Sequence, residues 1–206
     1  MGVVVSLVAM VTATSARADR EEFYTLIGYV PTAQHYDLPG NGSGSGTEFA
    51  NALDLTAYYG LTNTIHVGAR LRATISSDVH LADVRVNLPD GSVSPGDAFL
   101  DHRAVALSAL ALYRLDTGLH LAPMLEVEAG FSTHQYRRIA HVPAGVAFTI
   151  PLADVSETVF RAASALLLEY RFGNRWTASG GVGVQVEPSS HAPWAVLVPL
   201  RVGAVW

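Results

Sequence analysis

The chain has 206 residues, of which half are hydrophobic and 15% are charged; all 13 basic residues are arginine, and 18 acidic residues bring the net charge to −5. This length suits a single domain, and an acidic chain without a basic patch is not expected to bind nucleic acid. The lack of cysteine excludes disulfides and thiolate metal sites, and no metal or other cofactor is expected. The mean hydropathy is +0.27, yet past residue 14 no apolar run reaches the ~18 residues of a membrane helix. The apolar surface must therefore lie in a large core or face lipid through strands.

Residues 1–18 have the features of a secretory signal peptide. Gly2–Val11 form an apolar core, and Ser15–Ala18 supply a small-residue cleavage site. Cleavage near Ala18 leaves a mature barrel domain over 19–206 with a net charge of −6. Because no basic residue precedes the apolar core, an upstream start and a buried N-terminal strand or helix stay open as alternatives.

Short and long connections alternate along the mature chain. Short turns containing Gly, Asn or Asp follow or include aromatic residues at 59–63, 113–118 and 170–176. Short periplasmic turns that alternate with longer outward loops are typical of outer-membrane barrels. The longer connections, polar or rich in Gly and Pro, lie at 37–46, 77–101, 135–156 and 188–193.

Seven connections predict eight antiparallel strands in up-and-down order. Each predicted strand is longer than the ~9–11 residues that cross a bilayer, so some are expected to project beyond it. A register in which 77–101 and 135–156 add two more strands, ten in all, stays open. The eight predicted strands are 22–36, 47–59, 64–76, 102–114, 118–134, 157–172, 175–187 and 194–206.

Strict alternation of apolar and polar residues is clearest in the third strand. Ile65, Val67 and Leu71 share one face, while Arg70 and Arg72 share the other. Alternation by itself also fits a soluble barrel, whose apolar face points inward. The polar faces here contain Gly, Ser, Thr and a few Arg and Glu, unlike a soluble surface. We therefore expect the apolar face to point outward to lipid.

Aromatic residues collect at the short-turn end of the strands. A belt at one membrane interface accounts for this placement, since a soluble core has no reason to gather its large rings at one end. The fold class predicted is all-β, an eight-stranded antiparallel up-and-down transmembrane β-barrel. The predicted belt consists of Tyr59, Tyr113, Tyr170, Trp176 and Trp206.

The last predicted strand runs from Trp194 to Trp206 with apolar residues at every second position. It resembles the C-terminal strand of outer-membrane barrels, whose terminal aromatic residue is part of the signal read by the assembly machinery. The whole mature chain resembles the OmpA-type and OmpW-type small barrel families. This resemblance implies a monomer in the bacterial outer membrane, with outer-membrane lipid, lipopolysaccharide and the assembly machinery as partners.

Charged residues on the inward faces are balanced in sign. Buried charges are costly unless they are paired, and an eight-stranded barrel has room for side chains but little more. We therefore expect these groups, together with Arg171 and Glu187, to fill and lock the lumen; a narrow gated pore or carrier for small or hydrophobic solutes is the alternative. The predicted charge network is Asp54, Arg70, Arg72, Glu126, Glu128, Arg161, Glu169 and Arg201.

Ser132 and His134 share a face at the outer end of the fifth predicted strand. Some small outer-membrane barrels are lipid A-modifying enzymes that use a Ser and a His near this interface, but no third partner is identifiable here, so no catalytic residues and no enzymatic activity are predicted. A lipid A-modifying enzyme that uses Ser132 and His134 stays open as a third hypothesis, after the structural barrel and the gated pore. Scattered histidines at the loop end are read as solvated, without metal-ligand spacing. Among the loops, 89–91 is expected at a hairpin tip, and the apolar stretch 140–152 is expected to cover the mouth, extend the strands or bind a hydrophobic partner.

Overall fold

The computed structural model describes residues 22–115, 117, 120–173 and 175–206, and the predicted signal peptide lies outside them. No helix in this described part of the chain is long and apolar enough to cross a membrane. The strands are β1 (Phe23–Asp37), β2 (Gly42–Ser43), β3 (Ser45–Gly60), β4 (Ile65–Asn87), β5 (Val93–Arg114), β6 (Leu121–Pro143), β7 (Ile150–Pro151), β8 (Val155–Phe172), β9 (Trp176–Val186), β10 (Trp194–Leu197) and β11 (Leu200–Val205).

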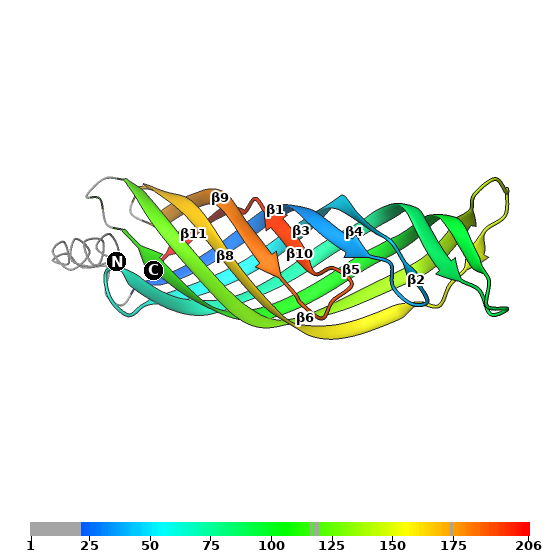
Figure 1. Cartoon of the computed structure of the whole chain (residues 1–206). Coiled ribbons are helices and arrows are strands. Elements are labelled where there is room, and N and C mark those ends of the chain that lie inside the picture. The colour runs from blue at the N-terminus through cyan, green and yellow to red at the C-terminus, as the bar shows by residue number, and fades with distance from the viewer. Residues whose placement is uncertain (1–21, 116, 118–119, 174) are drawn as a thin grey trace, which may run out of the picture.

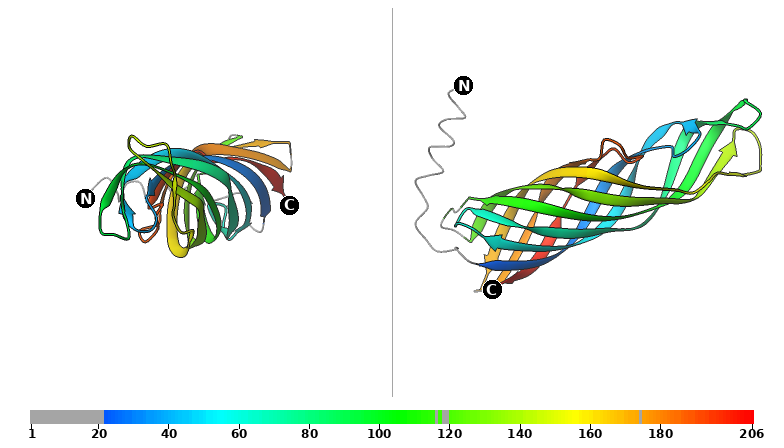
Figure 2. Two further views of the ribbon diagram at one scale, coloured as in Figure 1. Left: turned by 90° about the vertical axis from the view of Figure 1, so that its right-hand side faces the viewer. Right: turned by 90° about the horizontal axis from the view of Figure 1, so that it is seen from below.

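The long strands pair in a ring. Antiparallel ladders join β1 to β3, and then β4, β5, β6, β8 and β9 in sequence order. β10 and β11 follow each other along one stave and pair with β9 on one side and β1 on the other, which closes the ring. Over the described residues the wall therefore has eight staves, with β2 and β7 as two-residue additions (Figures 1 and 2). The eight-stranded antiparallel prediction is confirmed, and the ten-stranded register is wrong.

The third, fourth and fifth staves are longer than predicted. The predicted loops 77–101 and 135–156 are largely strand, because β4, β5 and β6 continue well past the other staves and form the projecting end at the right of Figure 1. The regular pattern is hidden in the sequence by shifts of register in the β4–β5 ladder, between Thr74 and Ser77 and between Leu81 and Val84. The predicted hairpin tip is present, with Gly91 at φ 82°.

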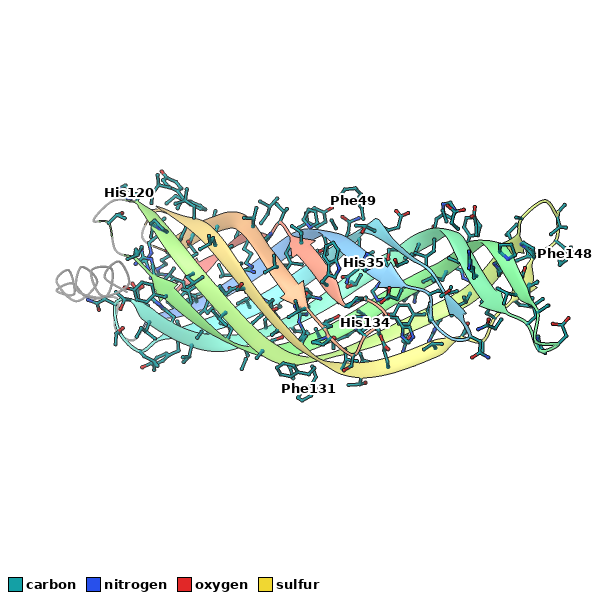
Figure 3. All side chains as sticks on the ribbon, in the orientation of Figure 1. His35, Phe49, His120, Phe131, His134 and Phe148 are labelled. Carbon is teal, nitrogen blue, oxygen red and sulfur yellow. The ribbon has the colours of Figure 1, made fainter. Side chains whose placement is uncertain are left out.

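An apolar band surrounds the half of the barrel nearest the short turns. On β5 the band runs from Val105 to Tyr113, and its outward-facing Leu107 is 64% exposed. Arg70 of the neighbouring β4 faces inward and is 2% exposed. The aromatic residues predicted as a belt lie at the short-turn edge of this band, and Tyr113 among them is half-buried. A second aromatic rim, not predicted, lies at the opposite edge; Phe49 and Phe131 mark it about midway along the barrel in Figure 3. This outer rim consists of Phe49, Phe131, Phe160 and Trp194, all exposed.

Beyond the outer rim the pattern reverses. Apolar residues of the projecting part point inward and form a buried core, while Asp78, His80 and Arg85 of β4 are exposed. Each change of side follows a bulge, including one on β6 where Arg138 has φ 52°. The core of the projecting part consists of Tyr36, Leu38, Val79, Leu81, Val84, Val86, Ala98, Leu100, Tyr136, Ile139 and Ala192.

Candidate functional site

Seven of the eight residues predicted as a charge network meet in one cluster at mid-height of the apolar band. Each of these side chains is at most 5% exposed. Gly28 makes room for them, because a Cβ there would lie 2.1 Å from Asp54 Oδ1 and 2.8 Å from Arg201 Cγ. The cluster comprises Asp54 of β3, Arg70 and Arg72 of β4, Glu126 and Glu128 of β6, Arg161 of β8 and Arg201 of β11.

Arg70 lies at the centre of this cluster. Its two terminal nitrogens donate to the Glu126 carboxylate at 2.7 and 2.6 Å, and one of them also contacts Glu128. Arg201 donates to the same Glu126 carboxylate at 2.9 and 3.2 Å and to Asp54 at 3.2 Å. The Tyr58 hydroxyl also donates to Glu126. Glu126 is therefore held by two guanidinium groups and a phenol.

The remaining arginines link the cluster to the opposite wall. Arg72 donates to Asp54 at 3.4 Å and to Gln185 of β9 at 3.3 Å. Arg161 donates to Gln185 at 2.7 Å and contacts Glu128. Charge-assisted hydrogen bonds of this kind compensate for the desolvation of the buried ions, and they connect β3, β4, β6, β8, β9 and β11 across the lumen.

Glu169 lies apart from this cluster, near the short turns. Its carboxylate accepts from Arg114 Nε at 2.6 Å and from Thr177 Oγ1 at 2.8 Å. Arg171, nearby, donates to Glu22 at 2.9 Å. An apolar layer that includes Leu110 separates the two groups, so the predicted network is divided in two. Arg114 was missed in the sequence, although its even position on β5 places it on the inward face.

A second polar group lies beyond the outer rim and is built on two histidines. His102 Nε2 is 2.9 Å from His134 Nδ1, and the two rings are stacked with centroids 5.2 Å apart. Tyr36 Oη lies 3.0 Å from His102 Nδ1. His102, His134 and His141 are at most 2% exposed, so the reading of these histidines as solvated is wrong. They are buried because their segments continue the wall.

Ser132 and Glu187 complete this group. His134 Nε2 lies 2.9 Å from Ser132 Oγ and 3.0 Å from Glu187 Oε2, and Ser132 Oγ donates to Glu187 Oε1 at 2.7 Å. In a serine triad the carboxylate accepts from the imidazole nitrogen opposite the one that faces the hydroxyl. Here both partners share Nε2 and His102 occupies the other nitrogen. The three side chains therefore lack the geometry of a charge relay, and they point into the lumen.

The lumen has little free space. A cavity of about 20 Å³ lies between the charge cluster and the histidines, lined by Arg72, His102, His134, Arg161 and Glu187 among others. This volume holds about one water molecule. No group of three or more His, Asp or Glu side chains in the described ranges is arranged to hold a metal ion.

Trp206 follows directly after β11, beside the short turns. Its indole is 68% exposed and donates to Thr25 Oγ1 at 3.2 Å, while its backbone nitrogen donates to Phe23 O at 2.9 Å. The residue is thus part of the closing seam between the first and last staves. Its role as an assembly signal stays a prediction.

Several solved structures have a similar fold, and two of them illustrate the match. Neisserial surface protein A (NspA) matches with a TM-score of 0.57 and 11% identity over 88% of this chain and 96% of its own. Ail, the attachment invasion locus protein of Yersinia pestis, in complex with the heparin analogue sucrose octasulfate, matches with a TM-score of 0.54 and 11% identity over 91% of this chain and 99% of its own. Both are eight-stranded outer-membrane barrels, so the predicted resemblance to small outer-membrane barrels is confirmed for the fold. No protein-family model and no curated protein matches the chain.

Proposed function

We propose that this chain is a monomeric integral protein of the bacterial outer membrane, with a structural or surface-interaction role and a lumen closed by its own side chains. The observation that carries the proposal is the apolar band, in which the hydrophobic side chains face outward and the charges inward. Leu107, Phe131 and Leu166 are each more than 60% exposed on this band. Water would penalise such a surface, whereas lipid would not.

The height of the band supports membrane insertion. On β6 it extends from Leu121 to Phe131, which is 11 residues, and a tilted strand needs ~9–11 residues to cross the hydrocarbon core. Aromatic rims at both edges match the girdles of outer-membrane barrels. We propose that the signal peptide directs export and is cleaved near Ala18, and that Trp206 contributes to recognition by the assembly machinery.

The lumen geometry supports a role without conduction. Paired charges fill the middle of the barrel. An apolar layer lies between them and the short turns, and the core of the projecting part lies on their other side. We therefore place the interaction surface on the outside of the projecting part, and the gated pore is the alternative outcome of the test below.

We further propose that outer-leaflet lipid and lipopolysaccharide contact the wall just beyond the outer rim. Two exposed arginines lie there. Arg103 is two residues from Val105 on β5, and Arg137 is six residues from Phe131 on β6. Neither guanidinium has an ion-pair partner within the described residues. Anionic phosphate groups would complement these arginines at the level where the apolar band ends.

The test is folding of the mature chain, 19–206, in phospholipid vesicles. We expect a protease-resistant barrel that remains with the vesicles after a carbonate wash and gives no steady conductance in a planar bilayer. A chain that is folded and monomeric in water without detergent would overturn the membrane assignment. A steady conductance that rises in Arg70→Ala would favour the gated pore instead.

We propose that the barrel has no catalytic activity, since Ser132 and His134 face the lumen and Glu187 approaches the wrong side of the imidazole for a triad. Incubation of the folded protein with lipopolysaccharide, followed by mass spectrometry of lipid A, is expected to show an unchanged lipid profile. Deacylated or newly acylated lipid A that disappears in Ser132→Ala would contradict this.

A further inference from the structure

One short segment closes the outer mouth of the lumen. This closing loop, Glu187–Pro193, joins β9 to β10 and places Ala192, which is 0% exposed, in the core of the projecting part. Gln34 Nε2 donates to Ala192 O at 3.1 Å, and Asp37 N donates to His191 O at 2.7 Å. The loop is thus fastened to β1 over the cavity that lies above the charge cluster.

The other side of the closing loop is held by the Glu157 carboxylate of β8. Oε1 accepts from Ser190 Oγ at 2.6 Å and from His191 N at 2.9 Å, and Oε2 lies 2.8 Å from His191 Nδ1. Tyr136 Oη also donates to Oε1 at 3.1 Å. An ionised carboxylate with this many donors depends on its negative charge, and a protonated Glu157 would lose most of these contacts.

The first residue of the closing loop, Glu187, contacts the pair formed by His102 and His134. Glu187 contacts His134, and His134 contacts His102 through facing ring nitrogens. His102 and His134 are buried together, so a proton added to His102 would place a positive charge in a site from which water is excluded. The closed loop therefore opposes protonation of His102.

Titratable or charged groups face this region from six strands and from the closing loop itself. They are Tyr36 of β1, Glu48 of β3, Arg72 of β4, His102 of β5, His134 and Tyr136 of β6, Glu157 and Arg161 of β8, and Glu187 and His191 of the closing loop. Of these, only the histidines and carboxylates change charge between pH 7.5 and 4 in water.

We propose that the closing loop is an acid-released lid: protons taken up by His102 and by Glu157 detach Glu187–Pro193 from the wall and open the outer mouth of the lumen. The lid can act this way only in the closed barrel proposed above, on which this inference rests. The surrounding strands stay paired, because their ladders do not depend on these side chains.

The sign of the pH dependence follows from His102, which lies beyond the outer rim. Burial, and then the neighbouring His134, lower the pKa of His102 from 6.5 to about 3 in the closed form. An opened loop that exposes His102 to water restores a pKa near 6.5. The closed form is therefore fully favoured above pH 6.5, and between about pH 6.5 and pH 3 the open form gains roughly tenfold for each pH unit.

Glu157 adds a second, more acidic step. Burial tends to raise the pKa of Glu157, but the hydrogen bonds from Ser190 and His191 prevail and lower it. This contribution favours the closed loop above the ordinary carboxyl pKa and is lost as the pH falls through the depressed value. Both groups therefore act in the same direction, with the histidine step at the higher pH.

The test is hydrogen exchange of the mature chain in phospholipid vesicles from pH 7.5 to pH 4.5, with each rate corrected for the intrinsic pH dependence measured on an unfolded peptide. We expect the protection of the amides of residues 189–192 to fall about 50-fold between pH 6.5 and pH 4.5, while residues 65–75 of β4 stay protected. Protection of 189–192 that does not change with pH would overturn the lid. Loss of protection in 65–75 at pH 7.5 would instead overturn the barrel proposal.

Three variants test whether His102 and Glu157 are the source of the pH dependence of loop protection. His102→Phe keeps an aromatic ring but removes the proton acceptor, so the change between pH 6.5 and pH 4.5 should shrink to less than about tenfold. His141→Phe, equally buried in the projecting part but not under the loop, is the matched control and should behave like the unmodified chain. Glu157→Gln should lower the protection of the amides of 189–192 already at pH 7.5. An unchanged pH response in His102→Phe together with full protection in Glu157→Gln would contradict the proposal.

Discussion

The two halves of β4 follow opposite rules. From Ile65 to Ile75 the apolar side chains point outward and the polar ones, including Arg70, point inward. From Ser77 to Asn87 the apolar side chains point inward, and residues such as His80 are exposed. A shift of register between Thr74 and Ser77 changes the side on which alternate residues lie. The polarity of the outer face thus differs between the two halves, as expected if the first half faces lipid and the second faces water, in the membrane-inserted barrel proposed above.

The two halves also differ in what holds them together. The lumen of the apolar band is crossed by ion pairs between Arg70, Glu126 and Arg201, whereas the projecting part is built on side chains such as Leu81 and Val84. A wall that faces lipid carries its apolar residues on the outside, so its interior consists of polar groups. These groups must pair with one another, because a buried charge without a partner is costly. The following changes test this division, from the largest expected effect to the smallest.

Removal of one carboxylate at the centre of the charge cluster should lower the free energy of unfolding more than any other change considered. Glu126→Ala leaves Arg70 and Arg201 buried with too few partners, and we expect the free energy of unfolding to fall by about 3–5 kcal/mol. Urea titration of the protein in vesicles, followed by tryptophan fluorescence, measures this. Asp90→Asn at the exposed hairpin tip is the control and should leave the midpoint unchanged. A loss below ~1 kcal/mol in Glu126→Ala would mean that the cluster is not the support of this half.

The projecting part should respond to the loss of an apolar side chain instead. Leu81 is 0% exposed, so Leu81→Ala is expected to destabilise its surroundings by about 2–5 kcal/mol. Hydrogen exchange should show faster opening of residues 77–87, with residues 65–75 unaffected. Phe99→Ala, at an exposed position of the same part, is the comparison. Equal loss of protection in both halves of β4 would show that they open as one unit.

A charge placed on the outer face should distinguish lipid from water directly. Leu107→Arg lies in the apolar band and is expected to cost about 2–4 kcal/mol in vesicles. Phe99→Arg, beyond the outer rim on the same strand, is expected to stay within about 0.5 kcal/mol. The ratio of the two effects, from the same urea titration, locates the edge of the membrane. Similar costs at both positions would contradict an edge between residues 99 and 107.

The exposed ion pair of the projecting part should matter least. Arg138 contacts Asp101, and the Arg138 side chain is 77% exposed, so we expect a coupling energy of about 0.2–1 kcal/mol. A double-mutant cycle with Arg138→Ala and Asp101→Ala measures it, and 1 M salt should remove most of it. Coupling that survives high salt would show that this pair is shielded from water.

Much of the wall was predictable from local pattern. Period-two alternation such as that of 65–75 places each side chain on one face or the other, and the turn residues mark the short connections. The extension of β4, β5 and β6 was not predictable in the same way, because single-residue bulges at Asp83 and Arg138 change the phase of the pattern without an obvious signal. Pro and Gly near these segments read as loop, although they lie in or beside paired strand.

The site was predictable in its members and less so in its partners. Alternation along each strand identified Arg70, Glu126 and the other charged residues near mid-height as inward-facing. Glu169 also faces inward, but it lies at another height, where it pairs with Arg114. Parity states which face a residue occupies, whereas contact across a barrel depends on strand tilt and stagger. The approach of His102, His134 and Glu187 from three staves therefore has no signature along the chain.

The sequence by itself determined an all-β chain of eight staves, an apolar outward face and a charged interior, because these follow from alternation and turn chemistry along each strand. Only the tertiary structure decided which charges meet, where the apolar band ends and what closes the outer mouth. Those features depend on the stagger of neighbouring staves and on bulges that reverse the inward side. A residue's own neighbours in the chain determine its face, but closure of the ring determines what lies across the lumen from it.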